Sequence, residues 1–179
     1  MQRIPTVTIG SAPQGSRPVL EQIKAKFGKV PNIFASVANS PAALKTLTGM
    51  FAALDEGALA GKAHEAIALR VGELNGCDYC RAAHTAKAKT LGVSVDETLA
   101  FRRGKVDDPK LGGILSLVTA LLEKRGRLTD AELAAARKAG LSDGEILETL
   151  AIVVLNIFTN YTNEVVKTEV DFPPAPPLR

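Results

Sequence analysis

The sequence of residues 142–158 is SDGEILETLAIVVLNIF, and it decides the fold class. Ser142 and Glu145 form a capping box, in which a hydroxyl and a carboxylate three residues apart accept the free backbone N–H groups at a helix start. Residues 146–158 are then apolar around nearly the whole helix circumference, which predicts a helix covered on most sides. We therefore expect a long buried helix over residues 143–169 in an all-α protein.

Helix start and stop signals recur along the rest of the chain. Capping boxes at Ser94 with Glu97 and at Thr129 with Glu132 predict helices over residues 94–103 and 130–139. Proline, glycine and asparagine bound six further expected helices, over residues 17–27, 32–38, 41–56, 62–74, 77–91 and 109–124. No strand-like alternation competes with them. The pattern divides the chain into an extended arm (1–16), one helical domain (17–170) and a Pro-rich tail (171–179) that is either a surface arm or a clasp on a neighbour.

Composition and charge exclude several classes of protein. The chain has 179 residues, enough for one domain with a substantial core, and a net charge of only +3. No dense Lys/Arg run with interleaved aromatic residues is present, so nothing indicates a nucleic-acid partner. The pair Arg102-Arg103 is expected to be a solvated helix end.

The hydropathy of the sequence predicts no membrane partner either. The most apolar stretch, Ile146 to Phe158, is interrupted by Glu148 and Asn156 and is too short to cross a bilayer. Residues 1–10 lack the basic start and apolar run of a signal peptide, so we expect a cytoplasmic protein.

The residues that carry chemistry are Cys77, Cys80 and His84. In a helix that starts near Cys77 they lie at i, i+3 and i+7, which places two thiols and an imidazole on one face. The unpaired N–H groups and the positive dipole of a helix start favour thiolate over thiol. A thiolate attacks a peroxide oxygen or a disulfide sulfur, and a second cysteine then resolves the product as a disulfide. His84 is placed to accept or relay the proton.

Two other interpretations of the cysteines have to be weighed. They are inert core residues if they are deeply buried, although the flanking Asp78 and Arg81 argue against deep burial. They are zinc ligands together with His84 if a fourth ligand exists, but the chain has no third cysteine. In the reducing cytoplasm a redox or metal role is favoured over a static disulfide.

Two residues of the preceding helix are candidates of lower weight. Glu65 lies in the first turn, where a carboxylate suits the helix dipole without any further role, and it is also an atypical fourth zinc ligand. His64 is expected at the surface or at a boundary.

The spacing between Glu65, the two cysteines and His84 favours a functional role for all four residues. Glu65, eleven residues, Cys77, two residues, Cys80, three residues and His84 resemble the signature of the alkyl hydroperoxidase D-like group of the carboxymuconolactone decarboxylase family. The text of residues 65–69 and 75–77 also resembles it, as do Asn156, Phe158, Thr159, Asn160 and Asn163 ahead of Asp171-Phe172-Pro173. The resemblance covers the chain from about Pro41 onward.

The resemblance implies both a fold and an activity. The fold is an all-helical bundle assembled into trimers or hexamers, and the activity is reduction of a hydroperoxide at the expense of a thiol or dithiol reductant, with no metal or organic cofactor. Cys80 is then the attacking thiol, Cys77 the resolving thiol, and Glu65 and His84 the proton relay. One departure matters: family members often carry histidine immediately before the second cysteine, where this chain has Tyr79, a poor base near neutral pH.

Two other functions remain open at this point. One is a lyase acting on a small lactone acid, with the cysteines incidental, although the decarboxylase branch of the family lacks the cysteine pair. The other is a non-enzymatic zinc-binding module.

A polar stripe on the long helix bears on both the site and the assembly. Asn156, Asn160 and Asn163 lie at i, i+4 and i+7, and buried amides need partners. We expect them to face the cysteine site or a subunit boundary, in a symmetric homo-oligomer.

Overall fold

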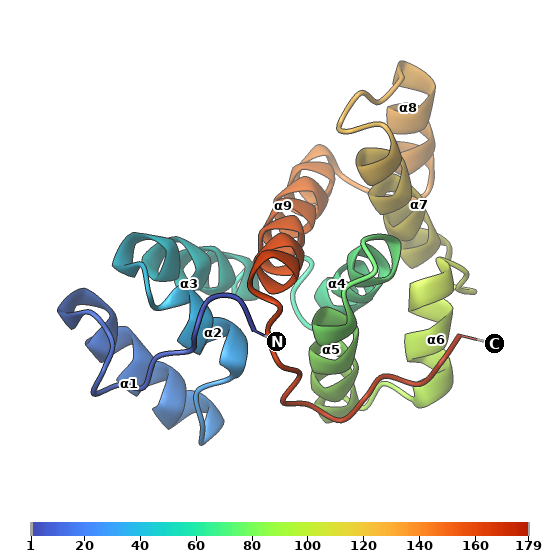
Figure 1. Ribbon diagram of the computed structural model, residues 1–179. Helices are drawn as coiled ribbons and strands as arrows, with labels where there is room; N and C mark the ends of the chain where they lie inside the picture. The colour runs from blue at the N-terminus through green and yellow to red at the C-terminus, as the bar shows by residue number, and fades with distance from the viewer. Residues whose placement is uncertain (1, 179) are drawn as a thin grey trace.

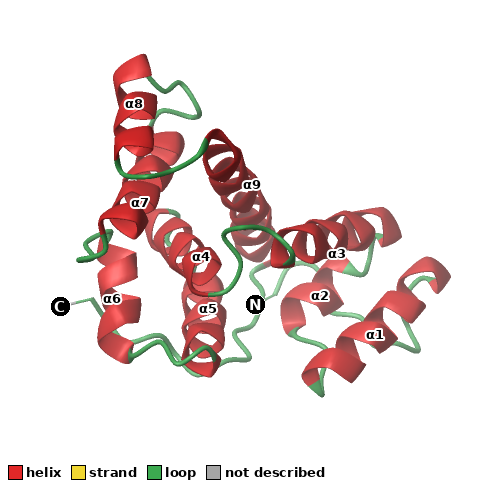
Figure 2. Ribbon diagram, turned by 180° about the vertical axis from the view of Figure 1, so that it is seen from behind, coloured by secondary structure: helices red, strands yellow, loops and turns green. Residues whose placement is uncertain are grey.

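The computed structural model describes residues 2–178, and the regular structure in that range is helical throughout, which confirms the all-α prediction (Figures 1 and 2). A short 3₁₀ turn, η1, precedes α1. The helices are α1 (Arg17–Phe27), α2 (Asn32–Val37), α3 (Pro41–Asp55), α4 (Lys62–Leu74), α5 (Asp78–Thr90), α6 (Val95–Arg103), α7 (Pro109–Glu123), α8 (Asp130–Lys138) and α9 (Asp143–Val166).

The helix boundaries follow the local signals in the sequence. The capping boxes that begin with Ser94, Thr129 and Ser142 are all formed, each with both of its hydrogen bonds. One predicted end is wrong, because α9 stops at Val166 rather than at residue 169. Lys167 adopts a left-handed conformation (φ 56°), and the N–H of Thr168 turns back to the Asn163 carbonyl.

Helix α4 lies at the centre of the arrangement. It packs against α5, α6, α7 and α9, and α9 also contacts α2 and α3. In Figure 1, α1 to α3 lie on one side of α9 and α6 to α8 on the other. The residues that precede the cysteines therefore belong to the most enclosed helix of the fold, and the cysteines follow directly after it.

Helix α9 is less covered than its sequence predicts. Part of its apolar surface lies in the core, with Ile152, Val153 and Leu155 buried. A second part is exposed along the whole length of the helix. It consists of Leu147, Leu150, Val154, Tyr161 and Val165, which we call the α9 stripe.

The C-terminal tail is an arm on the surface of its own chain. After α9 it runs past α5 towards α6 (Figure 1). Arg102 Nη1 donates a hydrogen bond to the Pro176 carbonyl, and Lys29 Nζ forms a 2.8 Å ion pair with Asp171. Arg102 is only 4% exposed, so the expectation of a solvated helix end is wrong at this residue. The tail covers Arg102 and accepts a hydrogen bond from its guanidinium group.

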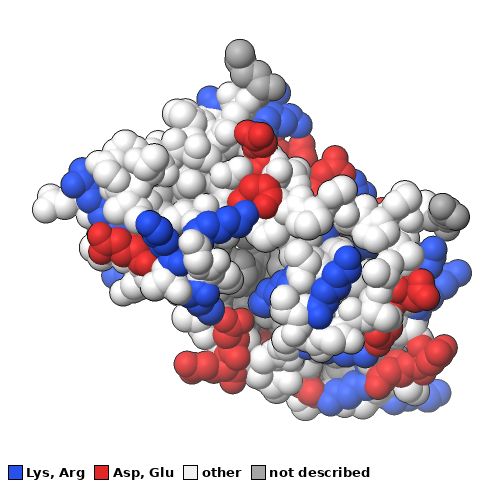
Figure 3. Space-filling model, turned by 90° about the horizontal axis from the view of Figure 1, so that it is seen from below, with Lys and Arg blue, Asp and Glu red and all other residues white. Residues whose placement is uncertain are grey.

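The surface carries charges of both signs. On the face shown in Figure 3, Lys and Arg side chains are interspersed with Asp and Glu. No helix within residues 2–178 has the length and apolarity that crossing a bilayer requires.

Candidate active site

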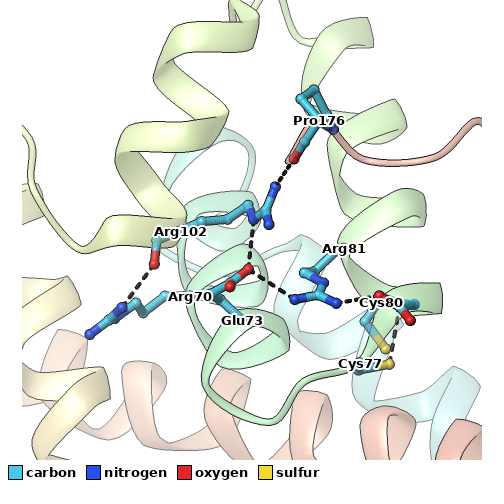
Figure 4. A network of polar contacts seen from close by, with 8 residues as sticks. Arg70, Glu73, Cys77, Cys80, Arg81, Arg102 and Pro176 are labelled. Atoms are coloured by element: carbon cyan, nitrogen blue, oxygen red, sulfur yellow. Dashed lines mark hydrogen bonds and ion pairs between the residues drawn. The ribbon is translucent and has the colours of Figure 1, made fainter. Parts of the chain in front are cut away.

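The two cysteines lie at the start of α5, where a tight turn brings the chain back after α4. Gly76 occupies the left-handed region (φ 67°), a conformation that glycine adopts without steric cost, and Cys77 is the N-cap of α5. The backbone N–H of Cys80 donates to Cys77 Sγ at 3.2 Å (Figure 4). Both residues are free thiols. The turn thus holds the two sulfur atoms at the positive end of one helix.

Both thiols are deeply buried. Cys77 is 0% and Cys80 2% exposed, so the prediction from their polar neighbours was wrong. Asp78 and Arg81 point away from the sulfur atoms and pair with each other instead. The cysteines belong to a hydrophobic cluster formed with α1, α2, α3 and Leu155.

The surroundings shift the pKa values of the two thiols in opposite directions. The side chain and the backbone N–H of Cys80 donate to Cys77, and these bonds lower the pKa of Cys77 although burial opposes them. The same bond to Cys77, together with burial, raises the pKa of Cys80. Of the two thiols, Cys77 is therefore the one that ionises more readily, and Cys80 is the one that holds its proton.

Glu65 and His84 form the second half of the site. His84 Nδ1 lies 2.8 Å from Glu65 Oε2, and Lys87 Nζ lies 2.9 Å from Glu65 Oε1. Burial alone would raise the pKa of Glu65, but His84 and Lys87 lower it to about 2, so the carboxylate stays ionised. Since His84 and Cys80 are four residues apart on α5, the Glu65–His84 pair lies one helical turn from the thiols.

The asparagine stripe of α9 only partly faces this site. Asn163 Nδ2 lies 3.3 Å from Cys80 Sγ and 3.9 Å from Cys77 Sγ. Asn160 Oδ1 accepts a hydrogen bond from Asn75 Nδ2, just before the cysteine turn. Asn156 bonds its own helix backbone, at the Ile152 carbonyl. Sequence spacing indicated the stripe, but not which amide reaches the sulfur atoms.

His64 is buried, contrary to the sequence-based expectation. It is 1% exposed, and burial lowers its pKa to about 4. Neither of its ring nitrogens has a hydrogen-bond partner among the residues that the structure describes. It is therefore a neutral imidazole in the fold, beside the ionised Glu65.

Tyr79 does not stand in for the missing histidine. Its hydroxyl accepts from the Ile33 N–H at 3.2 Å and donates to Asp171 Oδ1 at 2.7 Å. Burial raises the pKa of this phenol, which removes it further from base chemistry. The ring meets Phe172 edge-on, with 5.7 Å between centroids. Tyr79 thus anchors the tail across α5.

A cavity of about 640 Å³ lies on another face of α5, under the tail. Glu73 Oε2 accepts from Arg102 Nε at 2.8 Å and from Arg81 Nη1 at 3.4 Å (Figure 4). The two guanidinium groups that line the cavity, those of Arg81 and Arg102, are thus already paired with a carboxylate. Neither cysteine lines the cavity. We assign it no part in the thiol site.

The donor set for a metal is incomplete in this arrangement. Within the described part of the chain, no three His, Cys, Asp or Glu side chains lie close enough together to hold an ion. The sulfur atoms contact each other and an amide instead of converging with His84. The zinc alternative therefore finds no ligand set here.

Comparisons with known proteins agree with this architecture. Residues 41–108 match the carboxymuconolactone decarboxylase family. The alkylhydroperoxidase AhpD core protein from Ralstonia eutropha JMP134, described as an uncharacterized peroxidase-related protein, superposes with a TM-score of 0.86 and 21% identity over 95% of this chain and 92% of its own. No curated protein sequence matches the chain.

Two further solved structures share the fold. A peroxidase-related protein from Silicibacter sp. TM1040 gives a TM-score of 0.81 and 22% identity over 93% of this chain and 88% of its own. The debrominase Bmp8, solved as a Cys-to-Ala variant in complex with 2,3,4-tribromopyrrole, gives a TM-score of 0.79 and 18% identity over 96% of this chain and 92% of its own. Residues 41–108 thus resemble the carboxymuconolactone decarboxylase family, and the chain as a whole has the fold of the alkylhydroperoxidase AhpD core protein.

Proposed function

We propose that this protein is a thiol-dependent peroxidase in which Cys80 attacks a hydroperoxide and Cys77 resolves the product. One observation carries the proposal: two reduced thiols, joined by a bond from the Cys80 backbone N–H to Cys77 Sγ at 3.2 Å, lie one helical turn from His84, which contacts the buried and ionised Glu65. Residues that shift each other's pKa values in an enclosed site are typical of catalytic centres.

The chemistry conserves atoms and electrons in two steps. The Cys80 thiolate attacks one peroxide oxygen, the O–O bond breaks, and the sulfur becomes a sulfenic acid while the alkoxide takes a proton to leave as an alcohol. Cys77 then attacks the sulfenic sulfur and expels water, which leaves a Cys77–Cys80 disulfide. An external thiol or dithiol supplies two electrons and restores both thiols.

Cys80 has to lose its proton before it attacks. Because the pKa of Cys77 is lowered and that of Cys80 is raised, this proton passes either to Cys77 or towards His84. Glu65 stabilises the imidazolium that forms if His84 takes it, and the same imidazolium then protonates the leaving alkoxide. The pair thus serves as acid and base in turn.

The surroundings of the thiols favour a small and uncharged substrate. Both sulfur atoms lie in a hydrophobic cluster, with Leu155 buried and Phe158 half-buried beside it. Taking a charged peroxide into such a site costs desolvation free energy. Hydrogen peroxide and short alkyl hydroperoxides fit this condition.

The test is a thiol count during peroxide consumption. One equivalent of hydrogen peroxide or ethyl hydroperoxide is expected to remove two free thiols per chain, and dithiothreitol to restore them. Cys80→Ser is expected to abolish consumption. Full peroxide consumption by a protein with alkylated cysteines would overturn the proposal, and a lyase would be indifferent to that alkylation.

The same assay separates peroxide reduction from other uses of a dithiol. A cysteine pair delivers two electrons to any acceptor that its site admits, so 2,3,4-tribromopyrrole, the molecule bound by Bmp8, is a suitable second acceptor. Thiol loss with the bromopyrrole but not with peroxides would move the assignment to reductive dehalogenation.

A further inference from the structure

Two amides of α9, Asn163 and Asn160, lower the pKa of Cys80 by hydrogen bonding, and that of Asn163 is the stronger of the two contributions. Asn163 is 4% exposed, and its Nδ2 lies 3.3 Å from Cys80 Sγ. Its Oδ1 is buried with no partner among the described residues. A buried amide oxygen without a partner is costly, so its retention beside two reactive sulfur atoms calls for an explanation.

The two sulfur atoms depend on this amide to different degrees. Cys77 Sγ receives the Cys80 backbone N–H at 3.2 Å, and Asn163 Nδ2 is 3.9 Å away from it. For Cys80 Sγ the amide is 0.6 Å closer (3.3 against 3.9 Å), and no backbone donor to this sulfur is found within residues 2–178. Asn163 lowers the pKa of both thiols, but its removal is expected to affect Cys80 more, because Cys77 keeps the bond from the Cys80 backbone N–H.

We propose that Asn163 is a catalytic residue whose Nδ2–H stabilises negative charge on Cys80 Sγ as it attacks, and whose Oδ1 accepts the hydrogen of the sulfenic acid that forms. The first part concerns the reduced protein alone. The second rests on the proposed peroxidase function, because it needs the sulfenic acid.

A neighbouring amide contact holds Asn163 in register with the thiols. Asn160, one turn earlier on α9, accepts the Asn75 amide at 3.0 Å, and Asn75 is two residues before Cys77. This bond ties α9 directly to the turn that positions the cysteines. The amide of Asn163 thus approaches the sulfur atoms along a fixed line rather than from a mobile loop.

The electronic roles of Asn163 follow the reaction. When the Cys80 thiolate attacks, the bond to Nδ2–H stabilises the charged sulfur, which lowers its pKa against the effect of burial. After the O–O bond breaks, the sulfur carries an O–H group, and the free Oδ1 supplies an acceptor for it. One amide group then serves both states of the sulfur without moving.

The experiment titrates each thiol alone, by the ultraviolet absorbance of the thiolate against pH. Asn163→Leu is introduced into Cys77→Ser, which leaves Cys80, and into Cys80→Ser, which leaves Cys77. A hydrogen bond to a charged group corresponds to about one pKa unit or more, so the Cys80 pKa is expected to rise by at least about one unit. The Cys77 pKa is expected to move by less than about half a unit, because residue 80 keeps its backbone N–H.

Two variants control for altered packing. Asn156→Leu makes the same substitution at a buried amide of α9 that bonds only its own backbone, and it should leave both thiol pKa values unchanged. Asn163→Asp keeps the shape and replaces the donor by a charge, so it should raise the Cys80 pKa further than leucine does. It also answers the question if Asn163→Leu fails to fold.

Other titratable groups near the thiols stay constant across the series. Glu164 on α9 raises the pKa of Cys77, and Tyr79 and His84 on α5 and Glu65 on α4 complete the surroundings. Equal shifts at both cysteines, or a Cys80 pKa within about 0.3 of its parent in both Asn163 variants, would overturn the proposal.

The sulfenic acid gives a separate readout. Dimedone trapping on Cys80 in the Cys77→Ser protein is expected to fall at least tenfold in Asn163→Leu after a single dose of hydrogen peroxide. If no variant forms a sulfenic acid, the peroxidase function fails while the titration still decides the role of Asn163 in the reduced site. If trapping is unchanged, only the part of the proposal that concerns Oδ1 is wrong.

Discussion

Lys87 Nζ lies 2.9 Å from Glu65 Oε1, the carboxylate oxygen that His84 leaves free. The two contacts occupy both oxygens of a fully buried carboxylate, and Lys87 itself remains partly exposed on α5. A buried charge persists only when it is paired. Lys87 therefore keeps Glu65 ionised and leaves His84 free to exchange protons, a role that sequence spacing did not indicate.

Lys87→Met is expected to raise the pKa of Glu65 from its value of about 2. The folded pKa lies below the unfolded one, so ionised Glu65 stabilises the protein above about pH 4.5, and this is lost as pH falls towards 2. In the variant the acid limb of the pH profile for peroxide consumption should move upwards by about one unit. Lys89→Met, at an exposed lysine two residues away, is the matched control and should leave the limb in place.

Glu65→Gln and His84→Gln are each expected to slow oxidation of the thiols by about 10²–10⁴, the usual size of a lost acid–base contribution. Stopped-flow measurement of thiol loss after a peroxide dose gives the rate, and urea unfolding gives the stability. If Glu65 only favoured the dipole of α4, the rate of Glu65→Gln would stay within about twofold, because dipole effects amount to about 0.3–1 kcal/mol.

The fold could be predicted largely from local signals. Three capping boxes and a series of Pro and Gly residues fix where helices begin and end, because they satisfy or remove backbone donors within a few residues. The end of α9 could not be found in this way. Lys167 adopts a left-handed conformation that glycine usually occupies, so the residue type gave no signal.

The site was only partly predictable, because burial depends on distant segments. The family resemblance placed Glu65 and His84 in one proton relay; the structure brings the two side chains to 2.8 Å, and the relay itself stays a prediction. The burial of the cysteines was predicted wrongly. Asp78 and Arg81 form an ion pair with each other, while both cysteines are buried. His64 was placed wrongly for a similar reason: α4 packs against four helices, and residues 64–69 are all buried there.

His64 is expected to make stability depend on pH. Its pKa falls from 6.5 to about 4 on folding, so the unfolded chain binds more protons between these values and stability falls as pH is lowered from about 6.5 to 4. The loss amounts to about 3 kcal/mol. Urea unfolding at pH 7 and pH 4.5 measures it, with His64→Leu as the comparison. An equal pH dependence in both proteins would show that His64 is not the group responsible.

Tyr79→Phe is expected to loosen the tail and to spare the chemistry. The substitution removes a hydroxyl that hydrogen-bonds both Asp171 and the Ile33 N–H. The free energy of unfolding is therefore expected to fall by about 1–2 kcal/mol. Limited proteolysis should cut the tail sooner, while thiol oxidation by peroxide stays within about twofold. Asp171→Asn is the paired variant. A large loss of rate in Tyr79→Phe with an intact tail would instead place Tyr79 in the proton relay.

The α9 stripe predicts self-association. Leu147, Leu150, Val154, Tyr161 and Val165 recur at spacings of three, four and seven residues, so they form one apolar band along the exposed side of α9. An extended exposed apolar band on a soluble protein marks an interaction surface. A band on a single helix fits a copy of itself in a symmetric assembly, and we expect a trimer, or a hexamer built from trimers.

Multi-angle light scattering at micromolar concentration measures the mass directly. Val154→Glu places a charge at the middle of the α9 stripe, where pairing with another copy would bury it, and it should shift the protein towards the mass of one chain. Leu91→Glu makes the same kind of change at an exposed leucine that follows α5, outside the stripe, and it should leave the mass unchanged. A single peak at the mass of one chain for the unmodified protein would remove the prediction and leave the stripe as solvent-exposed surface. A shift of equal size in both variants would place the contact elsewhere than on α9.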